Sequence, residues 1–302
     1  MIRRVLALAL LLVVCLAPGG GLHAWGFDAH RAITSRAIDR LPPEIRPFFD
    51  AHRNFIVEHS VDPDLWRNAG FVEEPPRHFL DLDAYGAPPF SALPRDYPQA
   101  VAKFGEEMVK KNGTLPWRAQ EMYEQLVRAL VQHRENSSRW ALENAKFYAA
   151  VLSHYVADAH MPLHAIVNYD GQLTGQQGVH ARFESDLFVR NQARIKYAPV
   201  DLPAVTTARD LVFDALTSGA EASGRLLAAD RQALGDGLEY DDAYYERFWG
   251  GAGDLLDARL SRSVAAVAAL ITSAWEEAGR PDLTSAPARR PVQKKRTTTS
   301  GS

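Results

Sequence analysis

Residues 140–164 read WALENAKFYAAVLSHYVADAHMPLH, and the predicted fold depends on this stretch. Its first part repeats apolar side chains at steps of three and four residues, which is the spacing of one face of an α-helix. Those side chains are Trp140, Ala141, Ala145, Phe147, Tyr148, Val151, Leu152 and Tyr155. Two histidines and an aspartate follow before Pro162, a residue that ends helices. We therefore predict a helix over residues 138–160 with a polar C-terminal end.

Helical periodicity also dominates the rest of the chain. The predicted helices cover residues 28–41, 43–59, 96–111, 117–135, 138–160, 179–195, 206–229, 240–248 and 252–278. No stretch shows the sustained alternation of polar and apolar residues that a β-sheet needs. The 302 residues are 46% hydrophobic and 24% charged, which is enough to bury a sizeable core. We predict an all-α fold, a single compact multi-helix domain over residues 25–279.

The two ends of the chain differ from this body. Residues 1–24 begin with Arg3 and Arg4, continue with an apolar run and finish in small residues, which is the pattern of a secretory signal peptide cleaved after Ala24. An uncleaved membrane anchor is the alternative, although the apolar run is short for a span. We expect an exported protein, either periplasmic or secreted. Residues 280–302 are basic and rich in Pro, Thr and Ser, which predicts a disordered tail.

Charge and cysteine content exclude some functions. The net charge is −3 although both ends are basic, so the body between them is more acidic than this figure. An acidic body does not fit a protein that reads duplex DNA, because such a protein needs a basic face. Cys15 is the only cysteine and lies in the predicted signal peptide. The mature protein would therefore have no disulfide and no thiolate ligand for a metal.

The histidines indicate a metal site made of nitrogen and oxygen ligands. His154 and Asp158 are four residues apart, so they share one face of a helix, and His164 follows the proline that ends it. His180 and Glu184 repeat the four-residue spacing after a glycine-rich loop over residues 165–178. One such pair alone would be read as a solvated surface pair. Two pairs with a further histidine between them favour metal binding.

Further candidate ligands lie upstream in the chain. Asp62 and Asp64 stand in Asp-Pro-Asp-Leu-Trp-Arg, and His78 follows Asp64 after fourteen residues. His30 lies at the start of the first predicted helix. Nitrogen and oxygen ligands without sulfur suit zinc, and a site with open positions activates water. Several ions sharing a carboxylate could hold both the attacking and the leaving oxygen of a phosphate ester.

The order and spacing of these motifs resemble the zinc-dependent phospholipases C of bacteria and the related single-strand-specific zinc nucleases of fungi and plants. The resemblance covers about residues 25–279 and implies their common helical fold. In that superfamily the mature chain begins with a tryptophan whose amine and carbonyl oxygen bind a zinc ion. Cleavage after Ala24 would expose Trp25 in that role. The predicted cleavage site and the resemblance therefore indicate the same peptide bond.

The resemblance also implies the ligands of about three zinc ions. They are Trp25, His30, Asp64, His78, His154, Asp158, His164, His180 and Glu184. Trp25 and His30 would hold one ion, with Asp158 bridging to the second. The side chains of Asp64, His78 and His154 would complete the second site, and His164, His180 and Glu184 would hold the third ion.

Two neighbouring residues are secondary candidates. Asp64 is preferred to Asp62 because Asp-x-x-Arg and the gap to His78 match the family better. Asp64 is also the candidate general base, and the resemblance leaves open whether ligation or proton transfer is its main role. His160 fits the motif but is expected to orient a carboxylate or a loop rather than to bind a metal.

The sequence motifs indicate the substrate less clearly than they indicate the metal. Glu184 stands where the nucleases generally have Asp, and Phe-Leu-Asp-Leu-Asp after His78 is nearer the phospholipase pattern. The Asp-x-x-Arg element of Asp64 also resembles the nucleases, and the glycine-rich loop matches neither branch closely. The leading interpretation is a phospholipase C-like phosphodiester hydrolase in which metal-activated water attacks phosphorus. We expect a monomer, and peripheral contact with a membrane is compatible with this substrate.

Two other hypotheses stay open at this point. An exported single-strand-specific nuclease would need aromatic side chains on which bases stack. The candidates are Phe71, Tyr85, Phe90 and Tyr169, which could equally pack a core. A non-catalytic, zinc-stabilised helical binding protein is disfavoured, because ligands for three ions exceed what bracing a core requires.

Overall fold

The computed structural model describes residues 26–237 and 239–283, and none of them lies in a β-strand. The prediction of an all-α fold is therefore confirmed. No helix within these ranges is both long and apolar enough to cross a membrane. The predicted signal peptide, Trp25 and residues 284–302 of the predicted tail lie outside the described residues. At the other boundary, Leu283 is buried, and the carbonyl oxygen of Pro281 accepts a hydrogen bond of 2.9 Å from the indole of Trp275.

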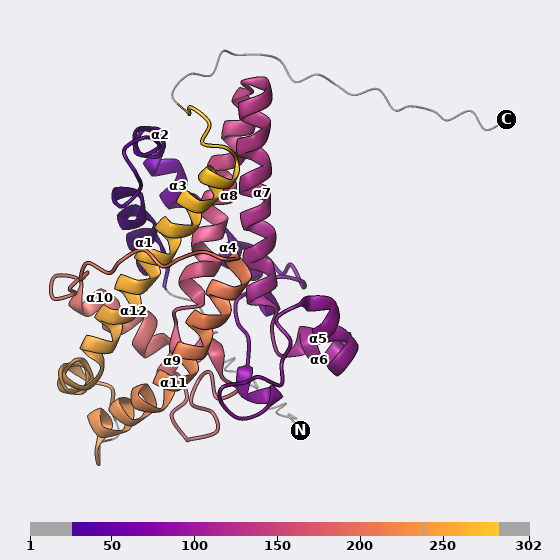
Figure 1. Cartoon of the computed structure of the whole chain (residues 1–302). Helices are drawn as coiled ribbons and strands as arrows, with labels where there is room; N and C mark the ends of the chain where they lie inside the picture. The colour runs from indigo at the N-terminus through magenta and orange to yellow at the C-terminus, as the bar shows by residue number, and fades with distance from the viewer. Residues whose placement is uncertain (1–25, 238, 284–302) are drawn as a thin grey trace, which may run out of the picture.

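Four long helices form the body of the molecule. These are α7 (Leu115–Asn136), α8 (Arg139–Asp158), α11 (Ala208–Leu234) and α12 (Asp242–Glu277). The helices α7 and α8 form a hairpin around Ser137 and Ser138, and α12 packs on α7, α8 and α11. In Figure 1, α1 (Phe27–Asp39), α2 (Arg46–Ala51) and α3 (Arg53–His59) lie on one side of these long helices. On the other side lie α5 (Tyr97–Phe104) and α6 (Glu106–Lys111).

Helix α8 is the centre of this arrangement. The side chain of Ser138 caps its start by accepting a hydrogen bond from the amide of Ala141. Every residue from Ala149 to Asp158 is buried, so both faces of the C-terminal half pack against other helices. Trp140 is the exception to the predicted apolar face, because its position in the first turn leaves it 55% exposed. The buried half of α8 carries His154 and Asp158 into the interior.

Some helix limits differ from the sequence prediction. The expected helix over residues 43–59 is interrupted at His52, between α2 and α3. The expected helix over residues 96–111 is interrupted at Gly105, whose φ of 84° is unsuited to a helix. A short helix α4 (Asp62–Asn68) also forms where none was predicted.

The glycines near residue 250 pack rather than break a helix. The sequence predicted separate helices over residues 240–248 and 252–278, but α12 runs through both. A Cβ atom added to Gly251 would lie 3.1 Å from the Cβ atom of Ala229 on α11. The missing side chain therefore permits close packing of α11 against α12, and tertiary contacts outweigh the weak helix propensity of glycine.

A buried polar network fixes the glycine-rich loop and the chain after it. The carboxylate of Asp230 on α11 accepts hydrogen bonds from Arg182 at 2.9 and 3.0 Å and from Gln176 at 2.7 Å. The hydroxyl of Tyr244 on α12 donates to the same carboxylate at 2.5 Å. Because Gln176 lies in the loop and Arg182 follows His180, this network connects two long helices to the second predicted metal-ligand pair.

We expect the substitution Asp230→Ala to destabilise the fold strongly. It would leave the buried guanidinium of Arg182 without its counter-ion, and losing one partner of a buried pair costs about 3–5 kcal/mol. The measurement is the free energy of unfolding from denaturant titration. Asp236→Ala is the matched control, since Asp236 is exposed, and it should change the free energy of unfolding little. Equal effects of the two substitutions would contradict the structural role of the network.

Candidate metal centre

Eight of the nine predicted ligands lie within the described residues, and all eight are buried. They are His30, Asp64, His78, His154, Asp158, His164, His180 and Glu184. They come from α1, α4, the segment after the 3₁₀ turn Pro75–Arg77, α8, the 3₁₀ turn η3 (Pro162–Ala165), and the helical stretch that begins with α9 (Val179–Ala181). The fold thus gathers side chains that are far apart in the sequence, and only Trp25 cannot be placed.

These side chains form three groups of potential ligands. Within each group, one donor atom of every residue lies within 4.8 Å of the others. The groups are His30 with His154 and Asp158, Asp64 with His78 and His154, and His164 with His180 and Glu184. His154 belongs to two groups, so the first two lie side by side.

Asp158 presents its two oxygens to different neighbours. Its Oδ1 lies 3.4 Å from Nε2 of His30 and 3.7 Å from Nδ1 of His164. Its Oδ2 lies 2.9 Å from Nδ1 of His78 and 3.2 Å from Nε2 of His154. One carboxylate therefore faces imidazoles from all three groups, which is the position a shared ligand requires.

The distances between donor atoms fit a tetrahedral metal ion. Two ligand atoms about 2.0–2.2 Å from a tetrahedral zinc lie roughly 3.3–3.6 Å apart. In the third group, Nε2 of His180 lies 3.2 Å from Nε2 of His164 and 3.1 Å from Oε2 of Glu184. Facing imidazole lone pairs repel each other unless a proton or a cation lies between them. The distances between these donor atoms are therefore already close to those between two ligands of one zinc ion.

Many of these donor atoms have no hydrogen-bond partner among the described residues. They include both ring nitrogens of His30, Nε2 of His78, Nδ1 of His164, Oδ1 of Asp158 and both carboxylate oxygens of Asp64 and of Glu184. A buried polar atom without a partner costs about 1–3 kcal/mol, and more when it is charged. Cations in the three groups would take one ring nitrogen of each histidine and the carboxylate oxygens as ligands, so the residues present fit zinc.

Backbone carbonyls orient two of the histidines. Nδ1 of His154 donates to the carbonyl oxygen of Ser60 at 2.8 Å, and Nδ1 of His180 donates to that of Tyr169 at 2.9 Å. With the proton on Nδ1, the lone pair on Nε2 is directed into the ligand group. Such hydrogen bonds fix the tautomer and the ring orientation of metal-binding histidines.

Burial and charge set the protonation of the metal-free centre. Burial, together with neighbouring His154, lowers the pKa of His30 to about 4, so this ring is neutral at pH 7. Burial also lowers the pKa of His78, but the hydrogen bond to Asp158 and the nearby carboxylate of Glu74 outweigh it and raise the value to about 9. His30 is thus ready to ligate, whereas His78 must release a proton when a metal binds.

The two secondary candidates lie outside the three groups. The carboxylate of Asp62 pairs with Nδ1 of His59 at 2.7 Å, whereas Asp64 points into the interior with Nη2 of Arg67 3.0 Å from its Oδ1. The ring of His160 donates from Nδ1 to the carbonyl oxygen of Val156 at 2.8 Å. The geometry therefore favours Asp64 over Asp62 and gives His160 no ligand position.

Glu74 is a buried neighbour of the candidate ligands that the sequence analysis missed. It is buried, accepts hydrogen bonds from the hydroxyl of Tyr155 and from Arg77, and has Oε1 3.6 Å from Nε2 of His78. Burial disfavours its charge, but nearby His78 and hydrogen bonds from Tyr155 and Arg77 outweigh this and lower its pKa to about 2. The available signal was its position four residues before His78, the same spacing as in the other two pairs.

The family model for zinc dependent phospholipase C matches residues 29–223. This chain belongs to the zinc-dependent phospholipase C family. The matched range contains all eight described ligand candidates and ends within α11. Membership implies, at the general level, a zinc-dependent hydrolase that acts on phosphodiesters. No curated protein matches this chain significantly.

We expect Asp64→Asn to lower the zinc content of the purified protein, because it removes a charged ligand from the second group. Asp62→Asn is the matched control, since Asp62 contacts His59 rather than the ligand groups, and it should leave the zinc content unchanged. Zinc per chain is measured by atomic absorption after dialysis. Loss of zinc in the Asp62 variant alone would reverse the assignment.

A second prediction concerns the segment that follows His78. Burial, with a smaller contribution from Asp83, raises the pKa of Asp81 to about 7. Since the folded state holds this proton more tightly than the unfolded chain does, stability falls as the pH rises from about 4 to about 7. Asp81→Asn cannot ionise. Its free energy of unfolding relative to that of the wild type should therefore rise by about 2 kcal/mol from pH 5 to pH 8.

Denaturant titrations at the two pH values check this prediction, with Asp236→Asn as the control at an exposed carboxylate. A difference between Asp81→Asn and the wild type that stays constant with pH would show that Asp81 does not titrate in this range.

Proposed function

We propose that this protein is an exported, monomeric phospholipase C that hydrolyses the phosphodiester of a phospholipid head group at a trinuclear zinc site. The observation that carries the proposal is Asp158, whose two oxygens face the ring nitrogens of four histidines. The family match supports the reaction class. The unpartnered donor atoms around Asp158 support a site for several ions rather than one.

The proposed ligand assignment follows the three groups. The side chains of Asp64, His78 and His154 would hold one ion, and those of His164, His180 and Glu184 another. His30 would hold the remaining ion together with the amine and carbonyl oxygen of Trp25, once cleavage after Ala24 frees that amine. Asp158 would bridge the ion held by His30 and the ion held by Asp64, His78 and His154.

Bound zinc ions would activate water and stabilise charge on the phosphate oxygens. Side chains of the protein would accept the proton and hold the reacting groups in position. The carboxylate of Asp64, buried and without hydrogen-bond partners among the described residues, would accept a proton from the attacking water. Arg67, 3.0 Å from one of its oxygens, would hold this carboxylate in position. The interior placement of the whole cluster would exclude bulk water.

The surface beside Asp64 supports a lipid substrate. Leu65, Phe71 and Val72 are exposed by 46%, 61% and 85%, which is unusual for such large apolar side chains. Phe71 and Val72 line a cavity of about 480 Å³ together with Arg77 and Arg118, which could contact a phosphate although each already forms an ion pair, with Glu74 at 2.8 Å and Glu121 at 2.7 Å respectively. An apolar edge next to cationic side chains fits the boundary between acyl chains and head groups.

The positions of the four candidate stacking residues weaken the nuclease alternative. Tyr85 and Phe90 were candidate stacking residues, but both are buried in the core and cannot receive bases. Phe71 and Tyr169 are exposed, and the ring of Tyr169 lies 6.4 Å from that of His180. Two separate aromatic side chains do not form the continuous platform that binds single strands.

The test is a parallel assay of the zinc-loaded protein on phosphatidylcholine vesicles and on single-stranded DNA. We expect release of the phosphorylated head group, abolished by a chelator and restored by zinc. Asp64→Asn should lower the rate by about 100-fold or more, because it removes both a ligand and the proton acceptor, whereas Asp62→Asn should stay near the wild-type rate. Faster cleavage of DNA would favour a nuclease, and no chelator-sensitive cleavage of either would favour a binding protein.

A further inference from the structure

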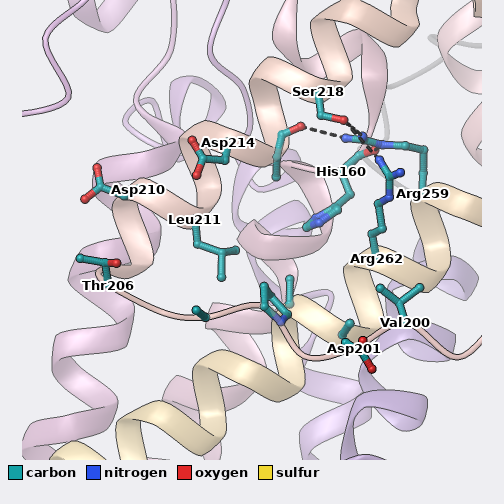
Figure 2. Close-up of a pocket in the computed structure, with 15 residues that line it drawn as sticks. His160, Val200, Asp201, Thr206, Asp210, Leu211, Asp214, Ser218, Arg259 and Arg262 are labelled. Carbon is teal, nitrogen blue, oxygen red and sulfur yellow. Dashed lines mark hydrogen bonds between the residues drawn. The ribbon is translucent and has the colours of Figure 1, made fainter.

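A second cavity lies away from the ligand groups, between α11, α12 and the chain around residue 200 (Figure 2). Its volume is about 350 Å³, within the range typical of pockets for small ligands. Arg259 and Arg262 project into it from α12 and Ser218 from α11, and the ring of His160 points toward its centre. Neither arginine has a role in the proposed hydrolysis.

Arg259 is a buried cation with neutral partners. Its side chain is 1% exposed and donates to the carbonyl oxygen of His160 at 2.5 Å, to that of Ala215 at 2.9 Å and to the hydroxyl of Ser218 at 3.0 Å. None of these acceptors carries a full negative charge. Burial, together with the nearby charge of Arg262, lowers the pKa of Arg259 to about 9. A buried charge of this kind is unfavourable unless an opposite charge approaches it.

The surroundings compensate this charge only in part. The carbonyl of His160 follows the C-terminal end of α8, where the helix dipole supplies about half a negative charge. Arg262 adds a full positive charge, and its Nη1 lies 3.3 Å from the hydroxyl oxygen of Ser218. The positive charges of Arg259 and Arg262 therefore both lie beside Ser218 at the inner end of the cavity, whose lining also holds three aspartates.

The acidic residues of the cavity are committed to other cations or lie at its rim. Asp214 is exposed and pairs with Arg95 at 2.5 Å. Asp210 lies 3.5 Å from both Arg95 and Arg209. Asp201 is exposed and lines the cavity from the segment around residue 200. None of the three forms an ion pair with Arg259 or Arg262 among the described residues, so the inner end is left for an external anion.

We propose that this cavity binds an anion carrying a phosphate group, held by the Arg259–Arg262 pair. Ser218 accepts hydrogen bonds from both arginines, so its own hydroxyl proton is free to donate to a phosphate oxygen. Arginine is suited to this ligand because its planar donors match phosphate oxygens. The phosphate is either free inorganic phosphate or the phosphate of a released head group.

The cavity and the ligand groups share one structural element. The carbonyl that Arg259 holds belongs to His160, which lies between Asp158 and His164 in the chain. An anion bound by Arg259 would thus also influence the turn that joins two predicted metal ligands. This inference does not rest on the proposed function, because the charge of the cavity is independent of the reaction.

The experiment is calorimetric titration of the full-length, zinc-loaded protein with inorganic phosphate and, separately, with phosphocholine. Arg262→Gln is the test variant, since Arg262 lies nearer the surface than the buried Arg259 and its loss should leave the fold intact. We expect its affinity for phosphate to fall about tenfold or more, as for loss of one charged hydrogen bond. Comparing the two titrants identifies the source of the phosphate.

Two controls separate this site from the metal centre. Arg128→Gln removes an exposed arginine that pairs with Glu124 on α7, and it should bind phosphate as the wild type does. Glu184→Gln alters the third ligand group, and the binding event that depends on Arg262 should persist in it. The proposal is overturned if neither titrant binds, or if Arg262→Gln and Arg128→Gln bind phosphate equally. Either result leaves the hydrolase assay unaffected.

Discussion

The ionised carboxylate of Asp158, fully buried among four imidazoles, is the constraint on which the rest of the structure depends. Burial disfavours its charge, but the nearby His154 and His164 outweigh burial and hold the pKa of this carboxyl well below its usual range. An interior carboxylate persists only when positive charge surrounds it. In this centre the positive charge comes either from protonated histidines or from metal ions. The helices that deliver those histidines must therefore converge on the end of α8.

Packing holds this electrostatically costly arrangement in place. The C-terminal half of α8 is buried on every face, so Asp158 cannot turn toward solvent without disrupting the core. Carbonyls of Ser60 and Tyr169 fix the rings of His154 and His180 from behind. At the far side, Asp230 anchors Arg182, which lies between His180 and Glu184 in a π-helical turn. Such turns are common at functional sites, where they redirect side chains within a helix.

The ligand pairs within one helix turn could be predicted from the sequence, whereas the contacts between distant segments could not. Spacing of four residues placed His154 with Asp158, and His180 with Glu184, because a helix turn fixes that geometry. His78 and Asp64 were candidate ligands by residue type, but only the family resemblance assigned them to the same site as His154, since no local rule brings distant segments together. Glu74 was missed because it lies in an irregular proline-rich segment and acquires its role through Tyr155 and His78. The continuity of α12 was missed because glycine propensity is local, whereas its packing against α11 is not.

The position of Arg259 shows how the C-terminal helix contributes to a centre whose ligands all precede it. Every described ligand candidate lies within residues 29–223, whereas Arg259 lies on α12, beyond that range. Its Nε holds the carbonyl oxygen of His160 at 2.5 Å, and η3 with His164 begins two residues later. A cation outside the matched range therefore helps to hold the backbone turn between α8 and His164. Because Arg259 also lines the cavity proposed to bind phosphate, one side chain of α12 contacts both that cavity and the turn that precedes His164.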